Sequence, residues 1–330
     1  MYFSCSKKLN QVNMKKLFTT VFLSIWVIAA YAQNVASKRN ANGKYGFVDK
    51  TGKEVIPFKY DEVGYNFEEG IIMVKLNGKY GFIDETGKVV IPIVYDEVRS
   101  LSEGLIGAKI NGKMGYLDKN GKEIIPFKYD NTSYFKDGFA PVELNGKSGY
   151  IDKTGKALTP IKYDVAFVFY NGFAMVRLNE KYGYIDHTGK EVVALKYEDG
   201  ESFREGFAGV KLNGKWGFVS ANGKEITRFK YDYVKEFYEG VAPVIKNNLY
   251  GAIDKNGTEI IPLKYRVIGD FADGMAKAGL NGMEGFISKT GEVVIPIKYD
   301  AVGEFKNGVA TFRLNGRWGS MDKTGKEITK

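Results

Sequence analysis

The chain has 330 residues, with 48 Lys and Arg against 39 Asp and Glu, and a formal net charge of +9. The lysines are spread evenly and form no basic cluster, which argues against nucleic acid as a partner. Cys5 is the only cysteine, so the sequence excludes a disulfide framework.

Residues 1–32 are predicted to be a cleaved signal peptide. Lys15 and Lys16 precede an apolar run that ends in Ala30-Tyr31-Ala32, a small-x-small pattern recognised by signal peptidase. The apolar run of about 14 residues is shorter than the roughly 20 that cross a bilayer, although an uncleaved anchor stays an alternative. We expect export to the periplasm, cell surface or medium, with peripheral membrane contact at most. Cleavage removes four lysines and no acids, which lowers the charge from +9 to +5.

A glycine recurs along the remainder of the chain, first after 35 residues and then after every 34. It stands at Gly46, Gly81, Gly115, Gly149, Gly183, Gly217, Gly251, Gly285 and Gly319. A fixed period of this size indicates one supersecondary unit copied in tandem. The sequence therefore predicts one array over residues 33–330, with eight full repeats and a partial C-terminal cap.

The first half of each repeat has the pattern of a tight hairpin. In the second copy, Asn77-Gly78 has the residues of a type I′ turn, in which both central residues take positive φ. A strand is expected over 80–83. Asp84 and Gly87 then occupy the first and fourth positions of a type I turn.

The second half of the repeat predicts two more strands. One is expected over 89–91 and to end at Pro92, because proline has no N–H for a central ladder and so marks a strand end or an edge. Tyr95 begins the next segment. In this copy the acid-Gly pair Glu103-Gly104 is expected to form a third turn, and a fourth strand is expected over 105–110. Without any helical periodicity, the fold is predicted to be all-β.

Two architectures fit these tandem repeats of short antiparallel hairpins. The favoured one is an open, solenoid-like array, because 34 residues is short for a propeller blade. In addition, the strand with the recurring glycine occurs nine times, whereas the segment that begins with the recurring tyrosine occurs eight times, and a closed ring would need equal numbers. The alternative is a β-propeller closed into a ring.

The motif around the recurring glycine resembles the WG (KWG) repeats of bacterial exported proteins. Lys215-Trp216-Gly217-Phe218 has the full motif, and Lys44-Tyr45-Gly46 and Arg317-Trp318-Gly319 are variants of it. The similarity extends over about residues 41–330. The resemblance implies a repeat scaffold without shared catalytic residues.

The residues whose side chains could take part in catalysis or bind a metal are explained better by their positions in the repeat. His187, the only histidine, occupies a turn position that is lysine, glutamate or alanine elsewhere. The recurring aspartates are expected to cap turns and not to bind calcium, since Ser220 and Ser288 replace two of them. Glu198, Asp199 and Glu201 form the one acidic group that departs from the repeat, and a solvated loop is expected there. We therefore predict a protein that is not an enzyme, with no cofactor and no metal.

The position before the recurring glycine is the best candidate for ligand contact. Aromatic residues occupy it in six copies: Tyr45, Tyr80, Tyr182, Trp216, Tyr250 and Trp318. Its variation predicts partial exposure, and evenly spaced aromatics can anchor a protein or stack on sugars. The alternative is a packed ladder between repeats. The leading hypothesis is an exported, non-enzymatic scaffold that binds a protein or the cell envelope; the second is a polysaccharide-binding module that uses this aromatic row. The oligomeric state stays open.

Overall fold

The computed structural model describes residues 35–328, so the predicted signal peptide lies outside the described residues. Every regular element in this range is a strand, which confirms the all-β prediction. The described chain falls into two compact units, residues 35–134 and 135–328. Within these residues, no helix has the length and apolar character needed to cross a membrane.

Each unit is a succession of small antiparallel sheets. The strands of the first unit are β1 (Ala36–Arg39), β2 (Tyr45–Val48), β3 (Glu54–Tyr60), β4 (Glu62–Val63), β5 (Ile71–Leu76), β6 (Lys79–Asp84), β7 (Val89–Tyr95), β8 (Glu97–Val98), β9 (Leu105–Ile110), β10 (Lys113–Asp118), β11 (Glu123–Tyr129) and β12 (Asn131–Thr132). The strands of the second unit are β13 (Phe139–Leu144), β14 (Lys147–Asp152), β15 (Val165–Ala166), β16 (Phe173–Leu178), β17 (Lys181–Asp186), β18 (Glu191–Tyr197), β19 (Asp199–Gly200), β20 (Phe207–Leu212), β21 (Lys215–Ser220), β22 (Tyr233–Val234), β23 (Val241–Lys246), β24 (Leu249–Asp254), β25 (Glu259–Tyr265), β26 (Val267–Ile268), β27 (Met275–Leu280), β28 (Met283–Ser288), β29 (Val293–Tyr299), β30 (Ala301–Val302), β31 (Val309–Leu314) and β32 (Arg317–Asp322).

The sheet β4-β5-β6-β7 shows the common plan of a two-residue strand followed by three longer ones. Asn77 and Gly78 have φ of 51° and 78°, which confirms the type I′ turn. Glu69 and Gly70 form a second turn with φ of 47° and 83°. The Asp84 carboxylate accepts hydrogen bonds from the backbone N–H of Thr86 and Lys88 and from the Thr86 hydroxyl, which confirms the capping role.

The third long strand differs from its prediction, because it continues through the proline. β7 runs from Val89 to Tyr95, with a bulge between its pairings Phe82↔Ile91 and Tyr80↔Tyr95. Pro92 lies in this bulge, where its missing N–H removes no ladder bond. The bulge brings the backbone onto Gly81: a Cβ there would lie 2.6 Å from the Ile91 carbonyl oxygen. At Gly81 glycine is therefore required by close approach of two backbones, and most of its counterparts are the same, whereas the nearest atoms at Gly217 and Gly319 belong to side chains.

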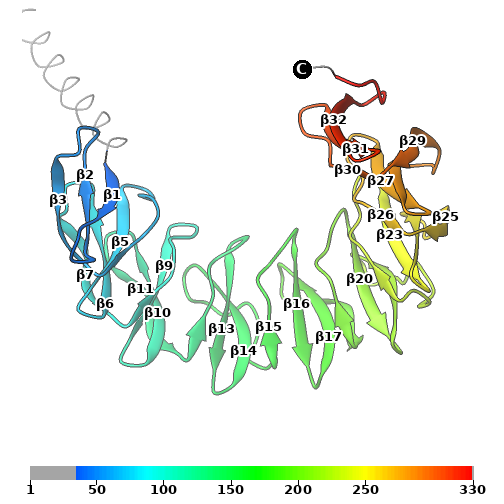
Figure 1. The fold of residues 1–330 in the computed structure, drawn as a ribbon. Coiled ribbons are helices and arrows are strands. Elements are labelled where there is room, and N and C mark those ends of the chain that lie inside the picture. Colours follow the sequence, from blue (N-terminus) through cyan, green and yellow to red (C-terminus); the bar gives the residue numbers. More distant parts are fainter. Residues whose placement is uncertain (1–34, 329–330) are drawn as a thin grey trace, which may run out of the picture. The chain divides into compact units, whose positions relative to one another are not determined.

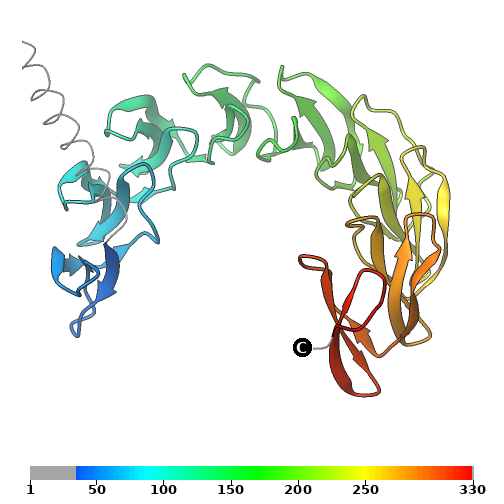
Figure 2. The same cartoon turned by 90° about the horizontal axis from the view of Figure 1, so that it is seen from above.

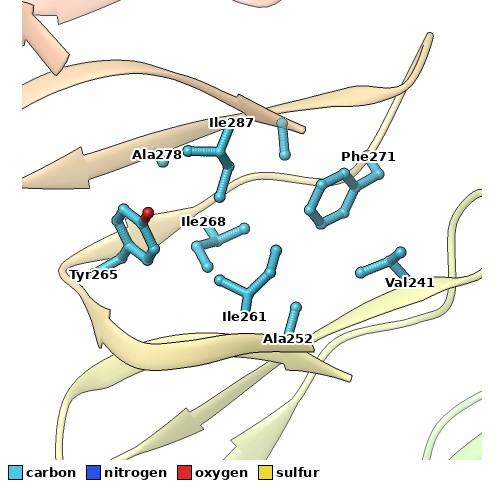
Figure 3. Packing of buried hydrophobic residues seen from close by; sticks show 9 residues of the cluster. Val241, Ala252, Ile261, Tyr265, Ile268, Phe271, Ala278 and Ile287 are labelled. Atoms are coloured by element: carbon cyan, nitrogen blue, oxygen red, sulfur yellow. The ribbon is translucent and has the colours of Figure 1, made fainter. Parts of the chain in front are cut away.

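Neighbouring sheets bury their apolar residues against each other. Figure 3 shows Ala252, Ile261 and Tyr265 of one sheet facing Ile268 and Ile287 of the next. Equivalent clusters recur between successive sheets in both units. Within each unit the sheets follow one another in chain order without closing into a ring (Figures 1 and 2), which confirms an open array of tandem hairpins at the level of the units.

The lysine of the recurring motif joins consecutive sheets. Lys147 Nζ lies 2.6 Å from Asp164 Oδ1, and Lys215 Nζ lies 2.7 Å from Asp232 Oδ1. In each pair the lysine precedes the position before the glycine, and the aspartate follows the recurring tyrosine. The hydrogen bond from Lys215 is the main cause that lowers the pKa of the Asp232 carboxyl. The motif residues thus have structural partners of their own.

Candidate functional site

Five of the six aromatic residues before the recurring glycine lie on the sheet face that is turned toward the next sheet, whereas Trp318 is in β32, in the last sheet of the described chain. Tyr45, Tyr80, Tyr182 and Tyr250 are half-buried, and Trp318 is 67% exposed. A cation from the opposite strand lies over several of the rings: Lys75 Nζ is 4.8 Å from the Tyr80 centroid, and Arg313 Cζ is 5.9 Å from that of Trp318. These cations reduce the ring surface open to a ligand.

The expectation of partial exposure is wrong for Trp216. This side chain is only 6% exposed, because its indole ring packs edge-to-face on Tyr233, with centroids 5.3 Å apart, and against Val234 of the next sheet. At this position the packed ladder between repeats is the better description. A ligand-binding role for Tyr45, Tyr80, Tyr182, Tyr250 and Trp318 stays a prediction.

The other chemical candidates lie in structural roles. His187 is exposed at a turn, where its ring packs 4.9 Å from Phe169 and its Nε2 lies 3.7 Å from the Asp137 carboxylate. Glu198 accepts a hydrogen bond from the Gly214 N–H, and Asp199 accepts one from the Gly200 N–H. Between residues 35 and 328, no group of three or more His, Cys, Asp or Glu side chains is arranged to hold a metal ion.

A different surface gathers aromatic and charged side chains in the second unit. We name it the loop edge: the segments that join each two-residue strand to the next two-residue turn, namely residues 167–170, 201–204, 235–238, 269–272 and 303–306. The successive sheets of this unit follow a curve. β26 and β27 lie on the inner side of that curve, and β25 and β29 lie on its outer side (Figure 1). The loop edge continues from the short strands, so it belongs to the inner side.

Arg204 is at the centre of one group on the loop edge. Its guanidinium lies 4.3 Å from the ring centroid of Tyr238, and its Nη1 donates a 3.3 Å hydrogen bond to the Tyr170 hydroxyl. The three residues are 34 apart in sequence and come from three successive repeats. Tyr170 remains 39% exposed, so the group is open to solvent while its geometry is fixed.

A second group adjoins it across a shallow, open hollow of about 320 Å³ lined by Glu201, Tyr233, Lys235, Tyr238 and Asp270, among others. The Tyr233 hydroxyl donates a 2.8 Å hydrogen bond to Glu201. Burial, aided by this hydrogen bond, raises the pKa of Tyr233 to about 12. Lys235 Nζ lies 3.2 Å from Asp270 Oδ1. The loop-edge cluster is the name that we give to the two groups together. It consists of Tyr233, which lies in the adjoining short strand β22, and of six residues of the loop edge: Tyr170, Glu201, Arg204, Lys235, Tyr238 and Asp270.

Buried residues beneath the surface position this cluster. The buried Tyr184 hydroxyl donates a 2.6 Å hydrogen bond to the Glu201 carbonyl, and Phe203 packs edge-to-face on Tyr184. Phe237 packs in the same way on Phe218 beneath the segment that contains Lys235 and Tyr238. The recurring Phe therefore anchors each loop, while the residues around it are free to vary. That variation within the repeat is the sequence signal that could have revealed the cluster.

The family model described as "WG containing repeat" matches eight consecutive segments of the chain. They are residues 45–80, 80–113, 114–147, 149–182, 182–216, 216–250, 250–283 and 285–318. Each begins at or beside the position before the recurring glycine. No curated protein matches the sequence.

Similar solved structures are distant in sequence. A crystal structure of a eukaryotic initiation factor is 9% identical with a TM-score of 0.42, over 90% of this chain and 95% of that one. Hsv2p of Kluyveromyces lactis is 10% identical with a TM-score of 0.35, over 77% and 92%. PorZ, a surface component of the type-IX secretion system of Porphyromonas gingivalis, is 10% identical with a TM-score of 0.28, over 88% of this chain and 52% of that chain.

Proposed function

The chain belongs to the family of WG-containing repeats, and from that premise we propose that it is a non-enzymatic scaffold that binds a protein partner. The observation that supports this most directly is the loop-edge cluster. Tyr and Arg are enriched among the residues that dominate binding energy at protein interfaces. Here Arg204 and Tyr233 are held in place by contacts within the chain, which lowers the entropy cost of binding.

A protein fits this surface better than a polysaccharide. Sugar rings stack on the free face of an aromatic side chain, whereas the Arg204 guanidinium covers one face of Tyr238. The cluster alternates charge, with Glu201 and Asp270 beside Arg204 and Lys235. Such a surface suits the mixed hydrogen-bonding groups and charges of a folded protein or peptide.

The proposed location is outside the cytoplasm, at the cell envelope or beyond it. It rests on the signal-peptide pattern in residues 1–32. Intact-mass measurement of the protein purified from its native cells is expected to show a chain that begins at Gln33. A full-length chain would contradict cleavage.

The binding proposal is tested with a double variant, Arg204→Ala with Tyr233→Ala, and with Tyr134→Ala as a matched control. Tyr134 is an exposed aromatic outside the cluster and outside the row of candidate ligand-binding residues. Residues 33–330 are immobilised, and proteins captured from the envelope fraction of the native cells are quantified. We expect specific partners to bind the control like the wild type and to fall by about tenfold or more with the double variant.

Two results would contradict the proposal. One is equal capture by the wild type and a double variant whose circular dichroism and melting temperature show it to be folded. The other is binding to a glycan array that the double variant loses, because this result would assign the cluster to polysaccharide.

A further inference from the structure

The first unit contains a cavity of about 260 Å³ beside the loops of two successive repeats. Its walls include Ile71, Met73 and Phe82 from one sheet and Arg99 and Leu101 from the loop that follows. Apolar surface dominates the walls, and Glu68 and Arg99 are the charged residues among them. The cavity lies wholly within residues 63–101 and is separate from the loop-edge cluster.

The equivalent positions in the other repeats show which side chains normally fill this space. In five of them the loop contributes a phenylalanine whose ring packs on an aromatic residue of the preceding sheet, and in a sixth Phe271 shares a core with Ala252. The centroid distances are 5.5 Å for Phe47 and Phe67, 5.2 Å for Tyr150 and Phe169, 5.0 Å for Tyr184 and Phe203, 5.0 Å for Phe218 and Phe237, and 4.8 Å for Phe286 and Phe305. At Phe82 the partner is Leu101, so the second ring is missing.

A second departure widens the same place. The segment between Tyr60 and Gly70 is one residue longer than in the other repeats, and Gly64, Tyr65 and Asn66 line the cavity. Tyr65 is fully exposed at its mouth, which is unusual for a large aromatic side chain. The two irregularities of the repeat pattern, Leu101 and the inserted residue, therefore meet at one cavity.

We propose that this cavity is a receptor for a phenylalanine side chain presented by a protein partner. An apolar cavity of about 150 Å³ is enough to hold benzene, so the space accommodates a phenyl ring. Phe82 and Met73 offer the edge and sulfur contacts that aromatic rings favour. The inference rests on the proposed function in one respect, namely that a protein partner supplies the phenyl ring. The affinity of the cavity for a phenyl group is tested independently of that function.

The test uses N-acetyl-phenylalaninamide as the probe and N-acetyl-alaninamide as its control. Methyl NMR signals of Ile71, Ile72 and Met73, which are present in both the wild type and the variant, are followed during titration. We expect saturable shifts with the phenyl probe, none with the alanine probe, and at least about tenfold weaker binding by Leu101→Phe. Because phenylalanine is the residue at the equivalent positions, this variant is expected to fold and to melt a few degrees higher.

Absence of shifts with the phenyl probe, or equal shifts in Leu101→Phe, would overturn the proposal. A lower melting temperature of Leu101→Phe would also overturn it, since the cavity would then not be a vacated phenylalanine site. If the probe binds but partners bind wild type and Leu101→Phe equally, the role in partner recognition is wrong, while the function proposed for the loop-edge cluster stands.

Discussion

Single residues in the turns show how tightly the backbone sets the sequence. Glu180 occupies the glycine position of an Asn-Gly turn and has φ of 62°. A left-handed conformation costs an L-residue roughly 1–2 kcal/mol, and part of that is offset by the greater freedom of glycine in the unfolded chain. We expect Glu180→Gly to stabilise the protein by about 0.5–1 kcal/mol, measured as a higher urea midpoint.

A substitution at the same turn position in the next repeat is the control. Gly214 has φ of 74° and open space around its Cβ position, so Gly214→Ala adds a side chain to this conformation without placing a new charge beside Glu198, which accepts a hydrogen bond from the Gly214 N–H. It should lower the urea midpoint by a similar amount. A neutral result for both variants would show that the turn conformation imposes no strain.

At the residue scale, turn chemistry was predictable from sequence and exposure was not. Asn-Gly and Asp-x-x-Gly act through their own neighbours, so Asn77, Gly78 and Asp84 adopt the expected conformations. Trp216 is buried by Tyr233, a residue of the next repeat, and no local pattern contains that contact. The loop-edge cluster likewise depends on side chains 34 residues apart that meet only after the sheets stack.

At the scale of one element, the bulged strand β7 explains the glycine at position 81. A Cβ on Gly81 would lie 2.6 Å from the Ile91 oxygen and 2.7 Å from Ile93 Cα, both backbone atoms that cannot move alone. We expect Gly81→Ala to destabilise the first unit by about 2–3 kcal/mol, measured by thermal and urea unfolding. Gly269→Ala is the matched control, because its nearest neighbour is 3.5 Å away and its φ is not left-handed. Equal effects of the two variants would refute the close-approach explanation.

The same element shows why a strand boundary was misjudged from sequence. Proline removes one donor, and the usual consequence is the end of a strand or an edge position. β7 is the edge strand of its sheet, and the bulge places Pro92 where no ladder bond is required, so the strand continues to Tyr95. Bulges depend on the pairing of two strands, and neither strand alone indicates them.

At the scale of the whole molecule, repetition multiplies small electrostatic effects. Hydrogen bonds from threonine lower the pKa of Asp49, Asp152 and Asp322, and hydrogen bonds from lysine lower that of Asp61, Asp96, Asp164 and Asp232. A carboxyl with a lowered folded pKa stabilises the fold above its unfolded pKa of about 3.9, and this contribution is lost as pH falls through the folded value. Stability should therefore be nearly constant from pH 7 to 5 and fall below about pH 4.

One inter-sheet pair tests whether these carboxyls cause the acid sensitivity. Asp232→Asn removes the titrating group, and Lys215→Met removes the donor that lowers its pKa. Both variants should narrow the difference in urea midpoint between pH 7 and pH 3, and the double variant should narrow it no further, because the two residues act as one pair. The effect of each pair is small because both side chains are partly exposed, and high salt should reduce it further. If the single variants keep the wild-type difference in urea midpoint between pH 7 and pH 3, the acid sensitivity arises from other groups. The lysine of the recurring motif would then contribute to the fold through packing and not through its charge.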